Sequence, residues 1–266
     1  MKVSIITVNY NDKVGLESTI CSVLKQDCRE FEYIIIDGGS TDGSVEVIQN
    51  YKEKIDYWVS EKDNGIYHAM NKGVAHAHGQ YCFFLNSGDS FYNDNVLKSI
   101  QDLGCDDDIV VGKVVSNKDH SQLFLPPSKE ISLYYLYSGT VPHQGAFIKS
   151  DLLRRIPYDE NLRIVSDWKF FLEAIILNNC SIQYIDEYIA EFDTTGLSTS
   201  NPEKMWKEKE RVLSDLFPPR VLADYSQMKS SECLTHSLTP QLRQHYRIDM
   251  FVYRMGRLLL KIVNGF

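Results

Sequence analysis

The sequence predicts an α/β protein in which a mostly parallel central sheet is flanked by helices and followed by a helical C-terminal extension. Two observations support this fold class. Short runs rich in β-branched residues, at 3–8 and 31–36, alternate with helical patterns at 15–26 and 44–51. From residue 200 onward the chain reads as helical.

The first 115 residues continue this alternation. The run at 3–8 has no polar face, which is typical of a strand buried on both sides of a parallel sheet. Further strands are predicted at 31–36, 57–59 and 81–85, and helices at 15–26, 44–51, 66–77 and 95–103. Because ligands of open α/β sheets bind where the strands end, the carboxyl ends of these strands are the first place to look for a site.

From residue 109 onward the pattern changes. Strands are predicted at 109–115, 122–125, 145–148, 182–185 and 188–192, with a strong helix at 167–177 and a polar loop at 194–199 that could serve as a lid. We therefore divide the chain into a first half at 1–115, a second half at 116–199 and the extension at 200–266.

Charge and cysteine content narrow the classes of function. The 266 residues carry a net charge of −8 and the pI is about 5.4, which argues against a nucleic-acid partner because phosphate binding needs a positive field. The six cysteines are scattered without a C-x-x-C pair, so no zinc knuckle is expected. The N-terminus is too short in apolar residues for a signal peptide, and a cytoplasmic location follows.

Two carboxylates come directly after buried strands. Asp37 follows the run at 31–36, and Asp89 follows the run at 81–85. Both are expected at the same edge of the sheet, where they could share a site. The glycine-rich turn after Asp37 lacks the G-x-G-x-x-G order of a dinucleotide site, and capping of the next helix explains part of it.

Six motifs, in this order and at this spacing, resemble family 2 glycosyltransferases with the GT-A (nucleotide-diphospho-sugar transferase) fold. They are SIITVNYN (4–11), IDGGSTDG (36–43), EKDNGIYHAMNKG (61–73), FLNSGD (84–89), HQGAF (143–147) and SDWKFF (166–171). The last two are similar to the bacterial polysaccharide-biosynthesis branch. The resemblance covers roughly residues 2–199.

For the donor, the resemblance implies that Asp89 binds a divalent metal, Mn²⁺ or Mg²⁺, on the diphosphate of a nucleotide sugar. Ser87 and Gly88 stand where further acids are common, so binding would rest mainly on Asp89 and the diphosphate. Asp37 would accept the imino proton of a pyrimidine. The other residues implied to bind the nucleotide are Thr7, Val8, Tyr10, Asp63, Gly65 and Asn71.

For the acceptor, the resemblance implies that Asp167 is the catalytic base of an inverting transfer. A carboxylate at a helix start is also explained by capping. His143, Gln144 and Ser87 would contact the acceptor or the diphosphate, although a lone histidine is often structural.

The segment 241–266 is a basic amphipathic helix by pattern, with five cationic side chains on one face and an apolar face opposite. We expect it to contact the inner face of a membrane, or to pack on the domain or on a second copy in a homodimer.

Taken with these observations, the resemblance implies a glycosyltransferase that moves a hexosyl or N-acetylhexosaminyl group from a nucleotide donor, most simply a UDP-sugar, to a glycan or lipid-linked acceptor. Two alternatives stay open. One is a relative that binds nucleotide sugars without catalysis. The other is a nucleotidyltransferase on a related fold, which should carry a basic, glycine-rich phosphate loop near its N-terminus.

Overall fold

The computed structural model describes residues 2–124, 131–194 and 201–228. The chain forms two compact units, Met1–Val212 and Leu213–Phe266. All of the predicted catalytic and binding residues belong to the first unit. The predicted subdivision at residues 115 and 199 stays a prediction, and the segment 241–266 lies outside the described residues.

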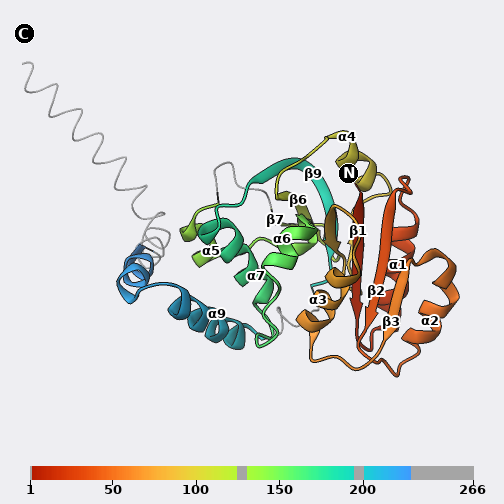
Figure 1. The fold of residues 1–266 in the computed structure, drawn as a ribbon, viewed down its shortest axis with the longest axis horizontal. Coiled ribbons are helices and arrows are strands. Elements are labelled where there is room, and N and C mark those ends of the chain that lie inside the picture. Colours follow the sequence, from red (N-terminus) through yellow and green to blue (C-terminus); the bar gives the residue numbers. More distant parts are fainter. Residues whose placement is uncertain (1, 125–130, 195–200, 229–266) are drawn as a thin grey trace, which may run out of the picture. The chain divides into compact units, whose positions relative to one another are not determined.

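The first four strands form the parallel part of the sheet (Figure 1). β1 (Val3–Asn9) pairs in parallel with β2 (Phe31–Asp37) and β4 (Tyr81–Phe84), and β2 pairs in parallel with β3 (Tyr57–Ser60). All seven residues of β1 are buried, as expected for a strand rich in β-branched residues. The helices between and after these strands also match the prediction: α1 (Lys13–Leu24), α2 (Ser44–Tyr51), α3 (Ile66–His76) and α4 (Val96–Asp102).

The strands after β4 convert the parallel sheet into a mixed one. β8 (Ala146–Lys149) runs antiparallel to β4 and to β6 (Ile109–Ser116), and β6 runs parallel to β9 (Ile182–Phe192). Short strands β5 (Ser90–Phe91) and β7 (Gln122–Phe124) pair with β9 and β6. Within the described residues the sheet has nine strands, in the order β3-β2-β1-β4-β8-β6-β9-β5 with β7 beside β6.

The two strands predicted at 182–185 and 188–192 are one strand, β9. Val111 of β6 faces Tyr184, whereas Lys113, two residues later, faces Tyr188, four residues later on β9. The extra residues form a bulge that contains the exposed pair Asp186 and Glu187. These charged residues interrupt the apolar pattern without ending the strand.

Helices of the second half and of the extension carry or support the site. They are α5 (Leu133–Ser138), the short turn η2 (His143–Gly145), α6 (Ser150–Arg155), α7 (Ser166–Phe171) and α9 (Pro202–Leu216). α7 continues as a wider π-helical turn, η3 (Leu172–Leu177), so the predicted helix at 167–177 is present with a change of winding. No helix among the described residues is long and apolar enough to cross a membrane.

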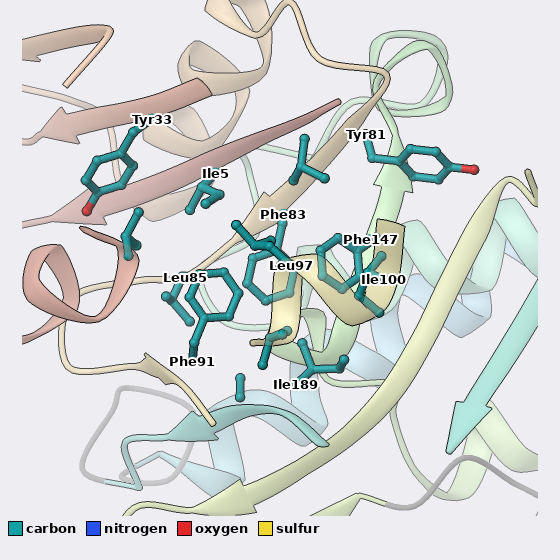
Figure 2. Packing of buried hydrophobic residues seen from close by; sticks show 14 of the residues in the cluster. Ile5, Tyr33, Tyr81, Phe83, Leu85, Phe91, Leu97, Ile100, Phe147 and Ile189 are labelled. Carbon is teal, nitrogen blue, oxygen red and sulfur yellow. The ribbon is translucent and has the colours of Figure 1, made fainter. Parts of the chain in front are cut away.

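Aromatic packing joins the parallel half to the mixed half (Figure 2). The Phe83 ring of β4 stacks on Phe147 of β8 with 4.5 Å between ring centroids, and on Phe91 of β5 at 5.2 Å. Full burial of such a ring contributes on the order of 1.5–3 kcal/mol. The five described cysteines are unpaired, and Cys82 and Cys105 are buried.

Candidate active site

A cavity of about 980 Å³ opens at the carboxyl ends of the parallel strands. Its wall combines the ends of β1, β2 and β4 with η2 and the start of α7, so segments far apart in sequence meet there. The predicted site residues that line it are Val8, Tyr10, Asp63, Gly65, Ser87, Asp89, His143, Gln144 and Asp167. The other three predicted site residues, Thr7, Asp37 and Asn71, do not line the cavity.

Asp37 lies beneath the cavity rather than in it. Its side chain is fully buried, and its two oxygens accept hydrogen bonds from the Asn9 amide, the Gly39 and Ser40 backbone N–H groups and the Ser40 and Ser60 hydroxyls, at 2.6 to 3.2 Å. Burial raises the pKa of the carboxyl, but these hydrogen bonds outweigh it and lower the pKa below its usual range. These internal donors hold the Asp37 carboxylate in place, and its expected contact with the imino group of a base stays a prediction.

Asp63 instead reaches the place where a side chain on residue 38 would stand. A Cβ atom added to Gly38 would lie 2.6 Å from Asp63 Oδ2 and 3.2 Å from Cδ2 of the Tyr10 ring. The other carboxylate oxygen, Oδ1, accepts the Gly65 backbone N–H at 2.8 Å. Tyr10 is 67% exposed, so a flat group could stack on its ring while it approaches Asp63 Oδ2.

Thr7 and Asn71 support the walls of the cavity. The Thr7 hydroxyl is buried and donates to the Leu85 carbonyl at 2.8 Å. The Asn71 amide donates to the Tyr158 carbonyl at 2.8 Å and accepts the Tyr158 N–H at 3.0 Å. Both were expected to contact the nucleotide directly, but these side chains are engaged with the backbone of the protein.

Asp89 is the buried carboxylate of the cavity, with 3% of its surface exposed. Oδ1 accepts the Asp193 backbone N–H at 2.9 Å, and Oδ2 accepts the Gln144 side-chain amide at 3.2 Å. Burial raises its pKa to about 6, because these contacts and the nearby His143 offset only part of the lost hydration. The Asp193 contact also places the residue directly after β9 against Asp89. Most of the loop that was expected to form a lid, 195–199, lies outside the described residues.

The groups around Asp89 fit a hard divalent cation that takes some of its ligands from the protein and the others from a substrate. Among the described residues there is no cluster of three His, Cys, Asp or Glu side chains suited to a metal. Mg²⁺ and Mn²⁺ in phosphoryl sites are commonly bound through one or two carboxylates together with phosphate oxygens. A buried carboxylate with a raised pKa matches that demand, since a neighbouring cation would favour its ionised form.

Asp167 lies at the start of α7 between two donors. Oδ1 accepts the Tyr67 hydroxyl at 2.9 Å, and Oδ2 lies 3.1 Å from His143 Nδ1. Burial raises the pKa of the Asp167 carboxyl, but the contacts with His143 and Tyr67 outweigh it and lower the pKa below its usual range. The carboxylate therefore stays ionised in a half-buried position, ready to accept a proton.

Adjacent residues of η2 contact the two site carboxylates separately. His143 contacts Asp167, and Gln144 contacts Asp89. One short turn therefore fixes the spacing between the two acids. The predicted contacts of His143 and Gln144 with acceptor or diphosphate stay predictions.

Several residues of the cavity wall were missed in the sequence. Tyr67, Asn86 and Arg163 line the cavity, and the Arg163 guanidinium donates to the Asn64 carbonyl at 2.5 Å. Arg163 lies in an ordinary polar turn, and its proximity to Asn64 depends on a contact between residues 99 positions apart. Local periodicity carries no signal for such a contact.

Comparisons with known proteins agree on one family. The family described as glycosyl transferase family 2 matches residues 4–158. A glycosyltransferase of Mycobacterium tuberculosis is 35% identical over 229 residues, which cover 80% of this chain and 81% of the relative. The putative teichuronic acid biosynthesis glycosyltransferase TuaG of Bacillus subtilis is 39% identical over 103 residues, 37% of this chain and 40% of that protein.

Among solved structures, S. aureus TarS 1-349 in complex with UDP-GlcNAc resembles this chain with a TM-score of 0.65 at 21% sequence identity. The match covers 80% of this chain and 66% of the TarS chain, just under two thirds of its length. At this identity the likeness establishes the fold.

Proposed function

Because the chain belongs to glycosyl transferase family 2 and has the GT-A fold, we propose that it is an inverting, metal-dependent transferase acting on a UDP-sugar. The acceptor would be a growing glycan or a lipid-linked saccharide in polysaccharide biosynthesis, and the group transferred a hexosyl or N-acetylhexosaminyl residue. The observation that carries this proposal is the pair Asp89 and Asp167, which line one cavity with pKa values shifted in opposite directions.

We assign the uracil to the space beside Tyr10 and Asp63. The exposed Tyr10 ring offers a stacking surface, and Asp63 Oδ2 offers an acceptor for the imino N–H at the edge of the base. The TarS structure with UDP-GlcNAc supports a uridine donor on this fold. Arg163, at the same side of the cavity, supplies a cation for the phosphate end of the nucleotide.

Asp89 would hold Mn²⁺ or Mg²⁺ together with the donor diphosphate. When bound, the cation neutralises charge on the departing diphosphate. The chain's own contribution is to keep Asp89 buried and oriented, through the Asp193 N–H and the Gln144 amide.

Asp167 would act as the general base. Its carboxylate takes the proton of the acceptor hydroxyl while that oxygen forms a bond to the anomeric carbon, and the bond from that carbon to the diphosphate oxygen breaks on the opposite face. His143 and Tyr67 orient the carboxylate and keep it ionised before the step. A single displacement of this kind inverts the anomeric configuration.

The two rival functions make different predictions for the same cavity. A binding protein without catalysis needs no ionised, half-buried base, so the Tyr67 and His143 contacts with Asp167 favour an enzyme. A nucleotidyltransferase would place a basic, glycine-rich loop after β1, whereas this chain has Asn9-Tyr10-Asn11-Asp12 there.

The decisive experiment is a donor screen that measures nucleotide diphosphate released in the presence of Mn²⁺, followed by NMR of the product to assign the anomeric configuration and linkage. We expect UDP from one or a few UDP-sugars. Binding of UDP-sugars without any release, with or without a panel of saccharide acceptors, would favour the non-catalytic alternative.

We further propose that the basic amphipathic segment 241–266 brings the enzyme to anionic lipid at the inner face of a membrane. The full chain should sediment with anionic vesicles at low salt and detach as salt rises. If a chain ending at residue 240 binds vesicles equally well but changes from dimer to monomer, the segment is an oligomer interface instead.

A further inference from the structure

Lys209 is a lysine in the buried face of α9. Only 6% of its surface is exposed, which is rare for a lysine unless it has specific partners. The next helical turn continues the same face with the buried Val212. The exposed Lys207, two positions earlier, contacts only its own helix among the contacts described for it, at Glu203.

Lys209 Nζ lies 5.5 Å from the centre of the Trp206 ring of its own helix, and two further partners lie on the segments that lead to His143 and to Asp167, the proposed base. The Lys209 Nζ donates to the Gly139 carbonyl at 3.0 Å and lies 4.7 Å from the centre of the Trp168 ring. Gly139 precedes His143 by four residues, and Trp168 directly follows Asp167. Lys209 therefore joins the approach to His143 to the start of α7.

Glu208, the neighbouring residue on α9, holds a third segment of the same wall. Its carboxylate accepts the backbone N–H groups of Arg163 and Ile164, at 2.9 to 3.2 Å. Arg163 and Ile164 both line the cavity. Adjacent charged residues of one helix thus hold the segment between α5 and His143, the start of α7 and the loop before it.

We propose that Glu208 and Lys209 are positioning residues for catalysis, and that α9 sets the distance between His143 and Asp167 by holding their two segments together. This inference rests on the proposed function of Asp167 as base. The 3.1 Å separation of His143 Nδ1 and Asp167 Oδ2 is the quantity that α9 controls.

A charge at position 209 does what an apolar side chain could not. An apolar residue would fill the same volume, but it would leave the Gly139 carbonyl without this donor and would lose the attraction to the Trp168 ring. The segment leading to His143 would then be free to shift, and a displacement of about 1 Å of a catalytic group can cost roughly 100-fold in rate.

The test compares Lys209→Met with wild type and with Lys207→Met, which removes a lysine from the exposed side of the same helix. We expect Lys209→Met to lower kcat for transfer roughly 10- to 100-fold while UDP binds with unchanged affinity and stoichiometry by calorimetry. The acid limb of the kcat profile should move to higher pH. Lys207→Met should match wild type in all three measurements.

The acid limb is informative because the groups that face Asp167 are known. They are His143 from η2, Tyr67 from α3 and Tyr158 from the segment before α7. The described contacts of Lys209 are with Gly139, Trp168 and Trp206 rather than with the side chains that face Asp167. A shift of the acid limb in Lys209→Met would therefore report a weakened His143–Asp167 contact. A second readout needs no activity: the ¹⁵N and ¹H NMR shifts of the His143 imidazole, assigned with His143→Gln, should move in Lys209→Met.

Each outcome separates this inference from the proposed function. If wild type shows no transfer, the proposed function fails, and the imidazole shifts alone decide whether Lys209 positions His143. Unchanged imidazole shifts together with a wild-type acid limb overturn the inference. A fall in kcat that is matched by an equal loss of UDP-binding sites also overturns it, because it would show partial unfolding rather than misplacement.

Discussion

The Asn86 side-chain amide lies 3.1 Å from His143 Nε2. In this arrangement the amide donates to Nε2, so the imidazole carries its hydrogen on Nδ1 and donates it to Asp167. The loop that ends at Asp89 is thus connected to the carboxylate at the start of α7 through a single imidazole. The acid that would meet the metal and the acid that would take the proton are therefore parts of one hydrogen-bonded assembly.

The first prediction concerns Asp167. Asp167→Asn keeps the shape of the side chain and can still accept the Tyr67 hydroxyl, but it removes the basic carboxylate. We expect kcat to fall by roughly 100- to 10,000-fold, the range typical of a lost general base. UDP affinity measured by calorimetry should be unchanged. A large loss of UDP affinity with little change in turnover of the bound donor would assign Asp167 to donor binding instead.

The second prediction is a pH effect of His143. Its contact lowers the pKa of Asp167 against the opposing effect of burial, so His143→Leu should raise that pKa. Because the base works only when ionised, the acid limb of kcat should move to higher pH. The profile is to be measured at saturating donor and Mn²⁺, since at low donor the protonation of Asp89 also contributes. Tyr67→Phe removes the other donor to Asp167 and should move the acid limb in the same direction.

The third prediction is that the ionised Asp89 side chain lowers the free energy of unfolding at neutral pH. Its pKa is about 6 in the folded chain against an ordinary value of 3.8, so the folded state keeps a proton that the unfolded chain has released between those two values. Stability therefore falls as pH rises from about 4 to about 6, by about 3 kcal/mol in total.

Asp89→Asn should accordingly raise Tm at pH 8 in chelator but not at pH 4, as measured by calorimetry, while transfer is lost. UDP with Mn²⁺ should raise the Tm of wild type more than that of the variant. Equal Tm values for the two proteins in chelator at pH 8 would contradict the raised pKa.

The fourth prediction concerns base recognition. A carboxylate that accepts the imino N–H of uracil has no such donor to meet in cytosine, and an unpaired buried group costs about 1–3 kcal/mol. Wild type should therefore bind UDP more tightly than CDP, and Asp63→Ala should bring the two affinities together. Asp37→Ala is the informative comparison, because it should lower Tm by leaving five internal donors without the carboxylate that accepts their hydrogen bonds. If Asp37→Ala folds normally and abolishes the preference while Asp63→Ala retains it, the base contact belongs to Asp37.

The parallel half of the fold was predictable because each strand and helix carries its own periodicity. For that reason the bounds of β1 and α2 match the predicted ranges to within a residue or two. β9 was predicted as two strands because the bulge at Asp186 and Glu187 is a property of its pairing with β6, which sequence order does not contain. The motifs located most of the cavity, but they did not show that the Asp37 side chain turns into the interior, because a motif gives the type of a residue and not the direction of its side chain.

The roles of Arg163, Glu208 and Lys209 could not be predicted from the sequence, for a related reason. Their partners Asn64, Ile164 and Gly139 are 99, 44 and 70 residues away in the sequence. Only folding brings them together, so composition and local pattern give no sign of them.

The burial of Asp37 has a consequence for how the nucleotide is received. Its five hydrogen bonds hold the turn at Gly39 and Ser40 in one conformation before any ligand arrives. The end of the cavity that we assign to the donor is therefore preorganised, and little conformational entropy remains to be lost there on association. Amide hydrogens of residues 38–40 should exchange with solvent at similarly slow rates with and without UDP. The change in heat capacity on binding should be no larger than the burial of the base and ribose requires.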